Sequence, residues 1–392
     1  MKIFHTGDWH IGKIVNQIHM TEDQAFALES LIELIDKEKP DVLIIAGDIY
    51  DRAVPPVDAV ELLDNFLSRI LLERGVPVLI VAGNHDSPDR LGFGSRILKA
   101  KGLYIAGRLE KEIQKVTLYD NFGPVNFYLV PYAPPAVVKE VLGREDICDH
   151  DTAIKAIVEK IKEQWSAEER NVFITHGFVR GLHDLLQSES EKPLTLTVGG
   201  ADYVNVNHLA DFTYTALGHL HSPQAAGLEH VRYSGSLLKY SFSEANQQKG
   251  ITIVNIGSDG RVEYEEKFLR VRRDMRKIKG ELAALLDPSV YEGTNTEDYL
   301  HVTLTDEGEL LEPMAKLRQV YPNVLALEFA NKERQAGESK TSAGEGYKQK
   351  SKLELFRDFY CDITGKEFTQ EKEEIIAGII AEVESQEREA NG

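Results

Sequence analysis

Three stretches near the N-terminus decide the fold: KIFHTGDWH at residues 2–10, DVLIIAGD at 41–48 and VPVLIVAGNHD at 76–86. Each is a short apolar run that stops at a glycine followed by polar residues. Continuous apolar runs of this length are typical of strands buried on both faces of a sheet. Residues 22–38 and 57–73 carry apolar side chains at helical spacing, and Thr21 with Gln24 predicts a capping box. Strands alternating with helices in this order predict an α/β layered core.

The same pattern recurs in two later strands, expected at 172–175 before His176-Gly177 and at 212–217 before Gly218-His219-Leu220-His221. Residues 231–233 and 251–256 are expected to be strands of a second sheet. Around residues 268–280 the composition changes, because arginines and lysines crowd together. This cluster could contact a DNA backbone, or it could be a solvated linker that balances an acidic surface.

The second half of the chain predicts further parts beyond this boundary. Residues 299–304, 309–319 and 324–329 are expected to form a strand, a helix and a strand. The expected division of the chain is 1–265 for the first α/β domain, 270–330 for a small α/β domain, 331–351 for a polar linker and 352–392 for an amphipathic helical tail.

The overall charge argues against a protein that binds nucleic acid through its bulk charge. The 392 residues include 45 Lys and Arg against 64 Asp and Glu, which gives a formal charge of −19. Such a surface repels nucleic acid unless local cations or a partner reverse the field.

Cys148 and Cys361 form no CxxC pattern, which excludes thiolate clusters and suits a reducing compartment. We find no signal peptide and no apolar run near ~18 residues, so a cytoplasmic protein that does not cross a membrane is expected.

Polar residues able to bind metal follow five of the expected strands, in the segments Asp8-Trp9-His10, Gly47-Asp48, Gly83-Asn84-His85-Asp86, His176-Gly177 and Gly218-His219-Leu220-His221. Ligands of α/β sheets bind at the carboxyl ends of strands, so these segments are expected at one rim. One histidine alone is more often structural, and a lone Gly-Asp more often a turn. Five such segments in order predict a dinuclear centre with oxygen and imidazole ligands, suited to Mn²⁺, Fe²⁺ or Zn²⁺. Two ions ~3.5–4 Å apart can hold the attacking and leaving oxygens of a phosphoryl displacement.

The series DxH, GD, GNHD, H and GHxH resembles that of the calcineurin-like metallophosphoesterases, and it is complete here. Within that superfamily the chain is similar to the bacterial nuclease subunits related to the archaeal and eukaryotic nuclease of double-strand-break repair. The segments that carry this likeness are 5–12, 46–51 with Pro55-Pro56, 82–87, 216–221 and 231–236. The likeness is strong over residues 1–260 and weaker over 270–330. In the tail it rests on the layout of the segments and not on sequence motifs. It implies a four-layer α/β/β/α sandwich with a small α/β capping domain and a C-terminal helical tail.

The resemblance also implies a role for each site residue. Asp8, His10 and His221 would bind the first metal, Asp48 would bridge the two metals, and Asn84, His176 and His219 would bind the second. His85 would face the scissile phosphate as the catalytic residue that stabilises the transition state and protonates the leaving oxygen. Asp86 would orient a neighbouring histidine or cap a turn. Relatives from archaea and eukaryotes carry a histidine near position 51 that handles the DNA strand, whereas this chain has Asp51.

The implied cofactor is two divalent ions, with Mn²⁺ expected. The implied activity is that of a DNA double-strand exonuclease and single-strand or hairpin endonuclease in repair, recombination and replication. A coiled-coil ATPase would gate it, and the helical tail would grip that coiled coil or pack back on its own catalytic domain. The resemblance also implies a nucleoid-associated homodimer within a heterotetramer, formed through helices near 57–73 and 87–101. Two alternatives remain open: a small-molecule phosphodiesterase or phosphatase on the same scaffold, and a scaffold protein with an inert site.

Overall fold

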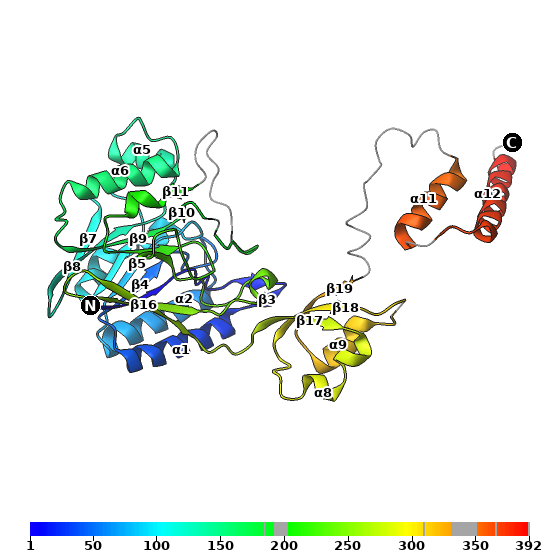
Figure 1. The fold of residues 1–392 in the computed structure, drawn as a ribbon, viewed down its shortest axis with the longest axis horizontal. Coiled ribbons are helices and arrows are strands. Elements are labelled where there is room, and N and C mark those ends of the chain that lie inside the picture. The colour runs from blue at the N-terminus through cyan, green and yellow to red at the C-terminus, as the bar shows by residue number, and fades with distance from the viewer. Residues whose placement is uncertain (184, 192–202, 309, 331–350, 365–366, 391–392) are drawn as a thin grey trace. The chain divides into compact units, whose positions relative to one another are not determined.

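The computed structural model of the chain describes residues 1–183, 185–191, 203–308, 310–330, 351–364 and 367–390 (Figure 1). It divides into two compact units, Met1–Arg276 and Lys277–Gly392, so the division falls inside the basic cluster expected at a boundary. The linker expected at 331–351 lies outside the described residues, apart from residue 351.

Two six-stranded sheets form the centre of the first unit. The first sheet has the order β16 (Val262–Phe268), β15 (Gly250–Ile256), β1 (Lys2–Thr6), β4 (Val42–Ala46), β5 (Val78–Val81) and β6 (Leu103–Ala106). The second has the order β13 (Gln224–Ala225), β14 (Val231–Tyr233), β12 (Tyr214–Gly218), β9 (Arg170–His176), β8 (Gly123–Val130) and β7 (Gln114–Asp120). In each sheet the central strands run parallel, and the antiparallel strands lie towards the edges.

The sheets face each other across a buried apolar layer. Ile3 and Ile44 of the first sheet belong to one cluster with Phe127 and Tyr214 of the second. Outside the first sheet lie α1 (Thr21–Glu38) and α2 (Val57–Ser68), which continues as a π-helical turn over Arg69–Glu73 (Figure 1). Outside the second sheet lie α5 (Pro135–Leu142) and α6 (His150–Lys162) (Figure 1). The four-layer α/β/β/α sandwich is therefore confirmed.

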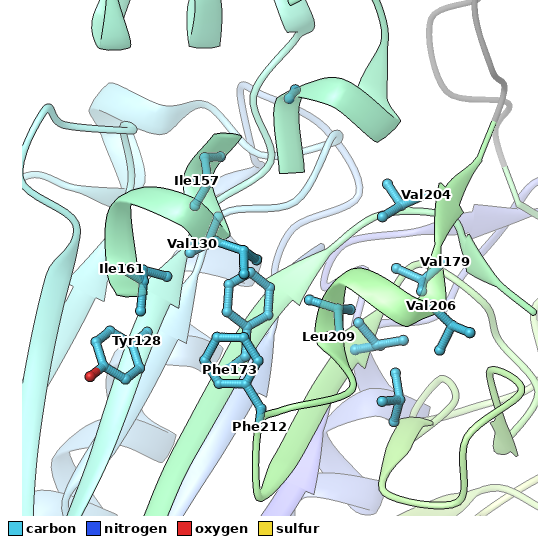
Figure 2. Close-up of a cluster of buried hydrophobic side chains, with 14 of the residues drawn as sticks. Tyr128, Val130, Ile157, Ile161, Phe173, Val179, Val204, Val206, Leu209 and Phe212 are labelled. Atoms are coloured by element: carbon cyan, nitrogen blue, oxygen red, sulfur yellow. The ribbon is translucent and has the colours of Figure 1, made fainter. Parts of the chain in front are cut away.

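A second apolar cluster fixes α6 on its sheet. Ile157 and Ile161 of α6 lie over Tyr128 and Phe173 of the second sheet (Figure 2). The helix begins with a capping box, in which Asp149 accepts a hydrogen bond from the Thr152 amide at 2.8 Å. Burial of this one face anchors the sheet from which His176 and His219 project.

Two local predictions are wrong. Residues 251–256 form β15, which pairs antiparallel with β1 in the first sheet and not in the second. Thr21 and Gln24 make no capping box, because the N-cap of α1 is Met20 and no side chain caps the helix. Thr21 donates instead to Asp58 at 3.0 Å, and Gln24 is buried among the loops of the site.

The second unit contains a small α/β domain. Strands β17 (Met275–Gly280), β18 (Tyr299–Leu304) and β19 (Val324–Phe329) form a three-stranded sheet, and β18 and β19 are parallel. Its core includes Leu300, Val302 and Leu317, the last from α9 (Pro313–Val320). The short helices α7 (Leu282–Leu285) and α8 (Pro288–Tyr291) precede β18. The expected strand, helix and strand are all present, although the helix begins at Pro313 and not at residue 309.

Two helices follow in the tail, α11 (Lys352–Thr364) and α12 (Gln370–Ala390). Apolar side chains on both remain exposed, among them Phe359, Ile375 and Ile379. Among the helices in the described part of the chain, none has the length and apolar character needed to cross a membrane.

Candidate metal centre

The parallel strands deliver the predicted ligands to one rim. Asp8 and His10 follow β1, Asp48 follows β4, and Asn84 follows β5. From the second sheet, His176 ends β9, and His219 and His221 follow β12. The two sheets therefore approach the site from opposite sides.

The backbone at this rim is held in an unusual conformation. Asp8, His10, Asp48 and His219 have φ values of 52°, 46°, 48° and 110°, in the left-handed region that disfavours side chains. Each such residue costs about 1–3 kcal/mol, so the surrounding structure must impose the conformation. Hydrogen bonds between loops do so, because the amide of Asp8 donates to the Gly47 carbonyl at 3.0 Å and that of His10 to the Asp48 carbonyl at 2.9 Å.

Asp8, His10 and His221 form the first cluster of metal-ligand side chains, with one ligand atom of each within 4.8 Å of the others. The Nε2 atoms of His10 and His221 face each other at 3.1 Å. Burial lowers the pKa of both rings, so both are neutral at pH 7. Two neutral imidazole nitrogens in this position can share one proton or direct both lone pairs at a cation. Burial and the nearby Asp48 raise the pKa of the Asp8 carboxyl beside them, so its charged form calls for a cation, and the donor set fits a divalent metal.

Asp8, Asp48 and His176 form a second cluster of the same kind. Oδ2 of Asp48 lies 3.5 Å from Nε2 of His176 and 3.7 Å from Nε2 of His10. This position between the two groups of histidines suits a bridging carboxylate. Oδ1 of Asn84 is 2.9 Å from Nε2 of His176. Burial raises the pKa of Asp48 to about 6, as expected for a carboxylate in a site that needs a cation.

His219 lies next to this cluster without joining it. Its ring centroid is 5.4 Å from that of His176. Burial lowers the pKa of both histidines, that of His176 to about 4. The His219 amide donates to both carboxylate oxygens of Asp8, at 2.9 and 3.0 Å. Among the described residues, His219 belongs to none of the three ligand clusters.

The buried histidines are oriented by hydrogen bonds at their other nitrogen. Nδ1 of His176 lies 3.0 Å from the carbonyl of Ala46, which can only accept. The proton is therefore on Nδ1, and Nε2 carries the lone pair towards Asp48. Such contacts to ligating histidines fix both the tautomer and the ring orientation.

His85 is oriented in the same way. Its Nδ1 is 2.7 Å from the carbonyl of Asp51, and its Nε2 is 3.8 Å from Oδ2 of Asp48. The Asp51 carboxylate lies 3.6 Å from Nδ1 of His10 and 2.7 Å from Nζ of Lys13. His10, Asp51 and His85 make up the third ligand cluster, so the structure brings Asp51 into the site.

Within the described part of the chain, the Asp86 carboxylate accepts hydrogen bonds from backbone amides and from no histidine ring. Its carboxylate accepts from the amides of Ile49, Tyr50 and Gly83, at 3.1, 3.0 and 2.9 Å. These contacts follow the turn-capping alternative and tie the loop after β4 to the loop after β5.

One glycine of the site is required by close packing. A Cβ atom on Gly83 would lie 2.2 Å from Oδ1 of Asp48. Real Cβ atoms do not approach so closely, so a side chain here would displace the carboxylate that lies between the two clusters. The glycine before Asn84 thus belongs to the machinery of the site.

Sequence reasoning missed a second group of residues around the ligands. The side-chain amide of Gln24 donates to the carbonyls of Trp9 and His10 at 3.1 and 2.8 Å and to Tyr240 at 3.0 Å. Its oxygen accepts from the amide of Gly12 at 3.0 Å. Gln24 therefore holds the first metal-binding loop from α1. The unusual position of a glutamine on an apolar helix face was the signal that could have revealed it.

Ser190, Glu244 and Lys249 were missed as well. Ser190 and Glu244 surround Nδ1 of His221, and Lys249 pairs with Glu244. None of the three has a sequence spacing that connects it to the ligand.

Three arginines of the basic cluster are paired with acidic residues of α1. Arg270 lies 2.5 Å from Glu33, Arg273 lies 3.2 Å from Asp23, and Arg272 pairs with Glu22. These contacts favour the interpretation in which the cluster balances an acidic surface.

Fold and site together define the class of protein. Residues 1–223 match the family model described as calcineurin-like phosphoesterase, and residues 271–363 match one described as type 5 capsule protein repressor C-terminal domain. The chain is 34% identical over 385 residues to the SbcD component of the nuclease SbcCD from Staphylococcus saprophyticus, an alignment that covers 97% of this chain and 98% of that protein. The chain therefore belongs to the SbcD family of calcineurin-like phosphoesterases.

Two solved structures are similar to this chain at low sequence identity. A dimetal phosphatase from Danio rerio is 14% identical with a TM-score of 0.44, and the match covers 70% of this chain and 97% of that one. The calcineurin-like phosphoesterase YfkN from Bacillus subtilis is 13% identical with a TM-score of 0.36, covering 69% of this chain and 90% of that one.

Proposed function

We propose that the chain is a metal-dependent DNA nuclease, a double-strand exonuclease and single-strand or hairpin endonuclease that acts in DNA repair, recombination and replication. One observation carries the proposal: buried carboxylate and neutral imidazole groups from both sheets meet at one rim in a chain that matches an SbcCD nuclease component over 97% of its length.

In this mechanism Asp8, His10 and His221 would hold one divalent ion, Asn84, His176 and His219 would hold the other, and Asp48 would serve both. When bound, the two ions, with Mn²⁺ as the proposed metal, polarise the phosphodiester and activate the attacking water. His85 would face the scissile phosphate and, in its imidazolium form with a proton on each nitrogen, would give the Nε2 proton to the leaving oxygen. The contact of its Nδ1 with the Asp51 carbonyl at 2.7 Å supports this role, because it directs Nε2 towards Asp48. Asp51 and Asp86 support the site, through Lys13 and through backbone amides respectively.

A substrate panel tests the proposal. The purified chain with Mn²⁺ would be given a labelled DNA duplex, a DNA hairpin and bis-p-nitrophenyl phosphate, each with and without the ATPase partner. We expect DNA cleavage. Hydrolysis of the small diester alone would make a small-molecule phosphodiesterase or phosphatase the better account, and no cleavage with no bound metal would favour an inert scaffold.

We further propose that the chain works as the catalytic subunit of an ATP-gated complex with an SbcC-type coiled-coil ATPase. The exposed Phe359, Ile375 and Ile379 of α11 and α12 support docking of the tail on that partner. In this division residues 1–265 are the nuclease domain, 270–330 the capping domain, 331–351 the linker and 352–392 the docking tail. Deleting 340–392 should abolish co-purification with the ATPase and spare the nuclease activity. Retained co-purification would favour packing of the tail on its own catalytic domain.

Homodimerisation within a heterotetramer is the proposed assembly. Val57 on α2, Phe93 in the turn before α4 (Ser95–Leu98) and Ile97 on α4 are 74%, 85% and 79% exposed, as expected for side chains that a second copy would cover. Sedimentation of a Phe93→Ser, Ile97→Ser double variant should give a monomer where the parent gives a dimer.

The net charge of −19 supports weak DNA binding by this chain alone. The proposed location is the cytoplasm, in association with the nucleoid.

A further inference from the structure

A buried ion pair lies at the Nδ1 edge of His221, and the mechanism above gives it no role. Glu244 is fully buried and Lys249 is 5% exposed. Nζ of Lys249 lies 2.6 Å from Oε2 of Glu244 and donates to the His221 carbonyl at 2.7 Å. Burying two charges costs several kcal/mol per ion before their attraction is counted. A pair kept at this position therefore needs a reason beyond stability.

The hydrogen bonds around His221 supply that reason. Oγ of Ser190 lies 2.7 Å from Nδ1 of His221, and it donates to Oε1 of Glu244 at 2.6 Å. A serine hydroxyl has one proton, and here that proton is donated in the hydrogen bond to the Glu244 carboxylate. The serine oxygen is then left to accept a hydrogen bond from Nδ1–H of His221. The imidazole lone pair consequently lies on Nε2, the atom that faces His10 at 3.1 Å.

We propose that Glu244, acting through Ser190, is a positioning residue that holds His221 in the tautomer with its proton on Nδ1, so that Nε2 is ready for a divalent cation. The inference rests on the metal site of the proposed function and adds to it residues outside the ligand set. Loss of such a partner of a ligating histidine typically lowers metal affinity by ~10–100-fold. Lys249 balances the charge that Glu244 brings into the core.

The same carboxylate ties the 188–191 segment to the site. Ser188 also donates to Oε1 of Glu244, at 2.7 Å, and the amide of His221 donates to Glu191 at 2.8 Å. Glu244 thus receives two hydroxyl donors on one oxygen and the ammonium of Lys249 on the other. A neutral glutamine amide in its place would accept weaker hydrogen bonds than the carboxylate. Its NH₂ group is itself a donor, so it would face either the two serine hydroxyls or the Lys249 ammonium unfavourably.

Three variants of the full chain test the proposal. Ser190→Ala removes the relay without touching Lys249, and Glu244→Gln removes the charge in a side chain of the same shape. Glu189→Gln is the matched control, because Glu189 is exposed in the same segment and, among the described residues, its side chain accepts a hydrogen bond from Ser241 alone, at 3.3 Å. Mn²⁺ would be titrated into each metal-free protein while the electron paramagnetic resonance of unbound Mn²⁺ is followed. We expect one of two sites to weaken by ~10–100-fold in the first two variants and neither site to change in the control.

A second readout follows the tautomer directly and needs no bound metal. In the metal-free parent, ¹⁵N NMR of labelled histidines should show His221 protonated at Nδ1 and unprotonated at Nε2. Ser190→Ala should shift that ring towards a mixture of tautomers, which a merely structural serine would not do. Circular dichroism of each variant would establish whether it is folded. If Glu244→Gln does not fold, Ser190→Ala alone tests the proposal.

The outcomes separate this proposal from the nuclease proposal. A folded Ser190→Ala protein with parental Mn²⁺ affinity and an unchanged His221 tautomer would overturn the positioning role. A parent with the proton on Nε2 of His221 would overturn it as well. If the variants behave as expected but the parent cuts no DNA, the positioning role stands and the nuclease proposal fails.

Discussion

Replacing Gly47 with alanine tests whether the turn after β4 sets the position of a metal ligand. Gly47 has a φ of +89°, and a Cβ atom built there would lie 2.4 Å from Nδ1 of His176. That is about 1 Å closer than the ~3.5 Å of an ordinary van der Waals contact. The His176 side chain is completely buried, so the ring must move within the site to make room.

The expected magnitude has two parts. An alanine in the left-handed conformation costs about 1–2 kcal/mol. Displacing the ring also breaks the contact of His176 with the Ala46 carbonyl at 3.0 Å, worth about 1 kcal/mol. We therefore expect the free energy of unfolding to fall by about 2–3 kcal/mol. A shift of about 1 Å in a catalytic group can lower the rate ~10²-fold.

Gly143→Ala provides the control. Gly143 ends α5 with a φ of +65°, and a Cβ atom there would meet nothing within 4 Å. Its free energy of unfolding should fall only by the cost of placing alanine in the left-handed conformation, while Mn²⁺ binding and hydrolysis of bis-p-nitrophenyl phosphate stay at the parental level. Urea unfolding, Mn²⁺ titration and the hydrolysis rate would be measured for both variants. If Gly47→Ala binds two ions with parental affinity and hydrolyses the diester at the parental rate, the reasoning about His176 is refuted.

Three further predictions concern residues outside the ligand set. Burial lowers the pKa of His5 to about 3, so below pH 6.5 the unfolded chain takes up a proton that the folded chain refuses, and stability falls with decreasing pH. His5→Asn should flatten the pH dependence of urea unfolding between pH 6 and 4 by up to ~1.4 kcal/mol per pH unit, and an unchanged slope would contradict the assignment. Gln24→Met should lower stability by ~1–3 kcal/mol and weaken Mn²⁺ binding at the first site, since it removes the side-chain oxygen that accepts from the Gly12 amide and one donor from each of the carbonyls of Trp9 and His10; parental Mn²⁺ affinity would argue against this role. Arg270→Glu with Arg272→Glu should leave the salt dependence of DNA binding unchanged, because both guanidinium groups are paired with α1, whereas a slope reduced by ~0.9 per lost phosphate contact would show that they bind DNA.

The strand-end segments could be predicted because their signal is local. An apolar run followed by glycine and a polar residue specifies a strand, its end and its chemistry within about ten residues of sequence, and the parallel order brings the ends together. Asp8, Asp48 and His176 meet for this reason. The same local signal identifies residues 251–256 as a strand but contains nothing about pairing. The placement of β15 beside β1 depends on contacts between residues about 250 positions apart, such as Phe4 with Ile253.

The supporting residues could not be predicted for a related reason. Gln24 bonds to Tyr240 across 216 residues of sequence, and Ser190 bonds to Glu244 across 54. A glutamine three residues after a threonine matches a capping box locally, and burial against the site overrides that preference. Glu244 likewise looks like an ordinary polar residue until the fold places it beside His221.

The most direct test of the central claim compares the parent with His85→Gln, a change beside the ligands that should leave the donor set intact. Both proteins would be given Mn²⁺ and a labelled DNA hairpin, with bound metal counted in parallel. The account predicts that the parent cuts the DNA and that the variant retains two ions per chain but loses cleavage. A parent that leaves DNA intact with and without the ATPase partner, or a variant that cuts DNA at the parental rate with both ions bound, would contradict it.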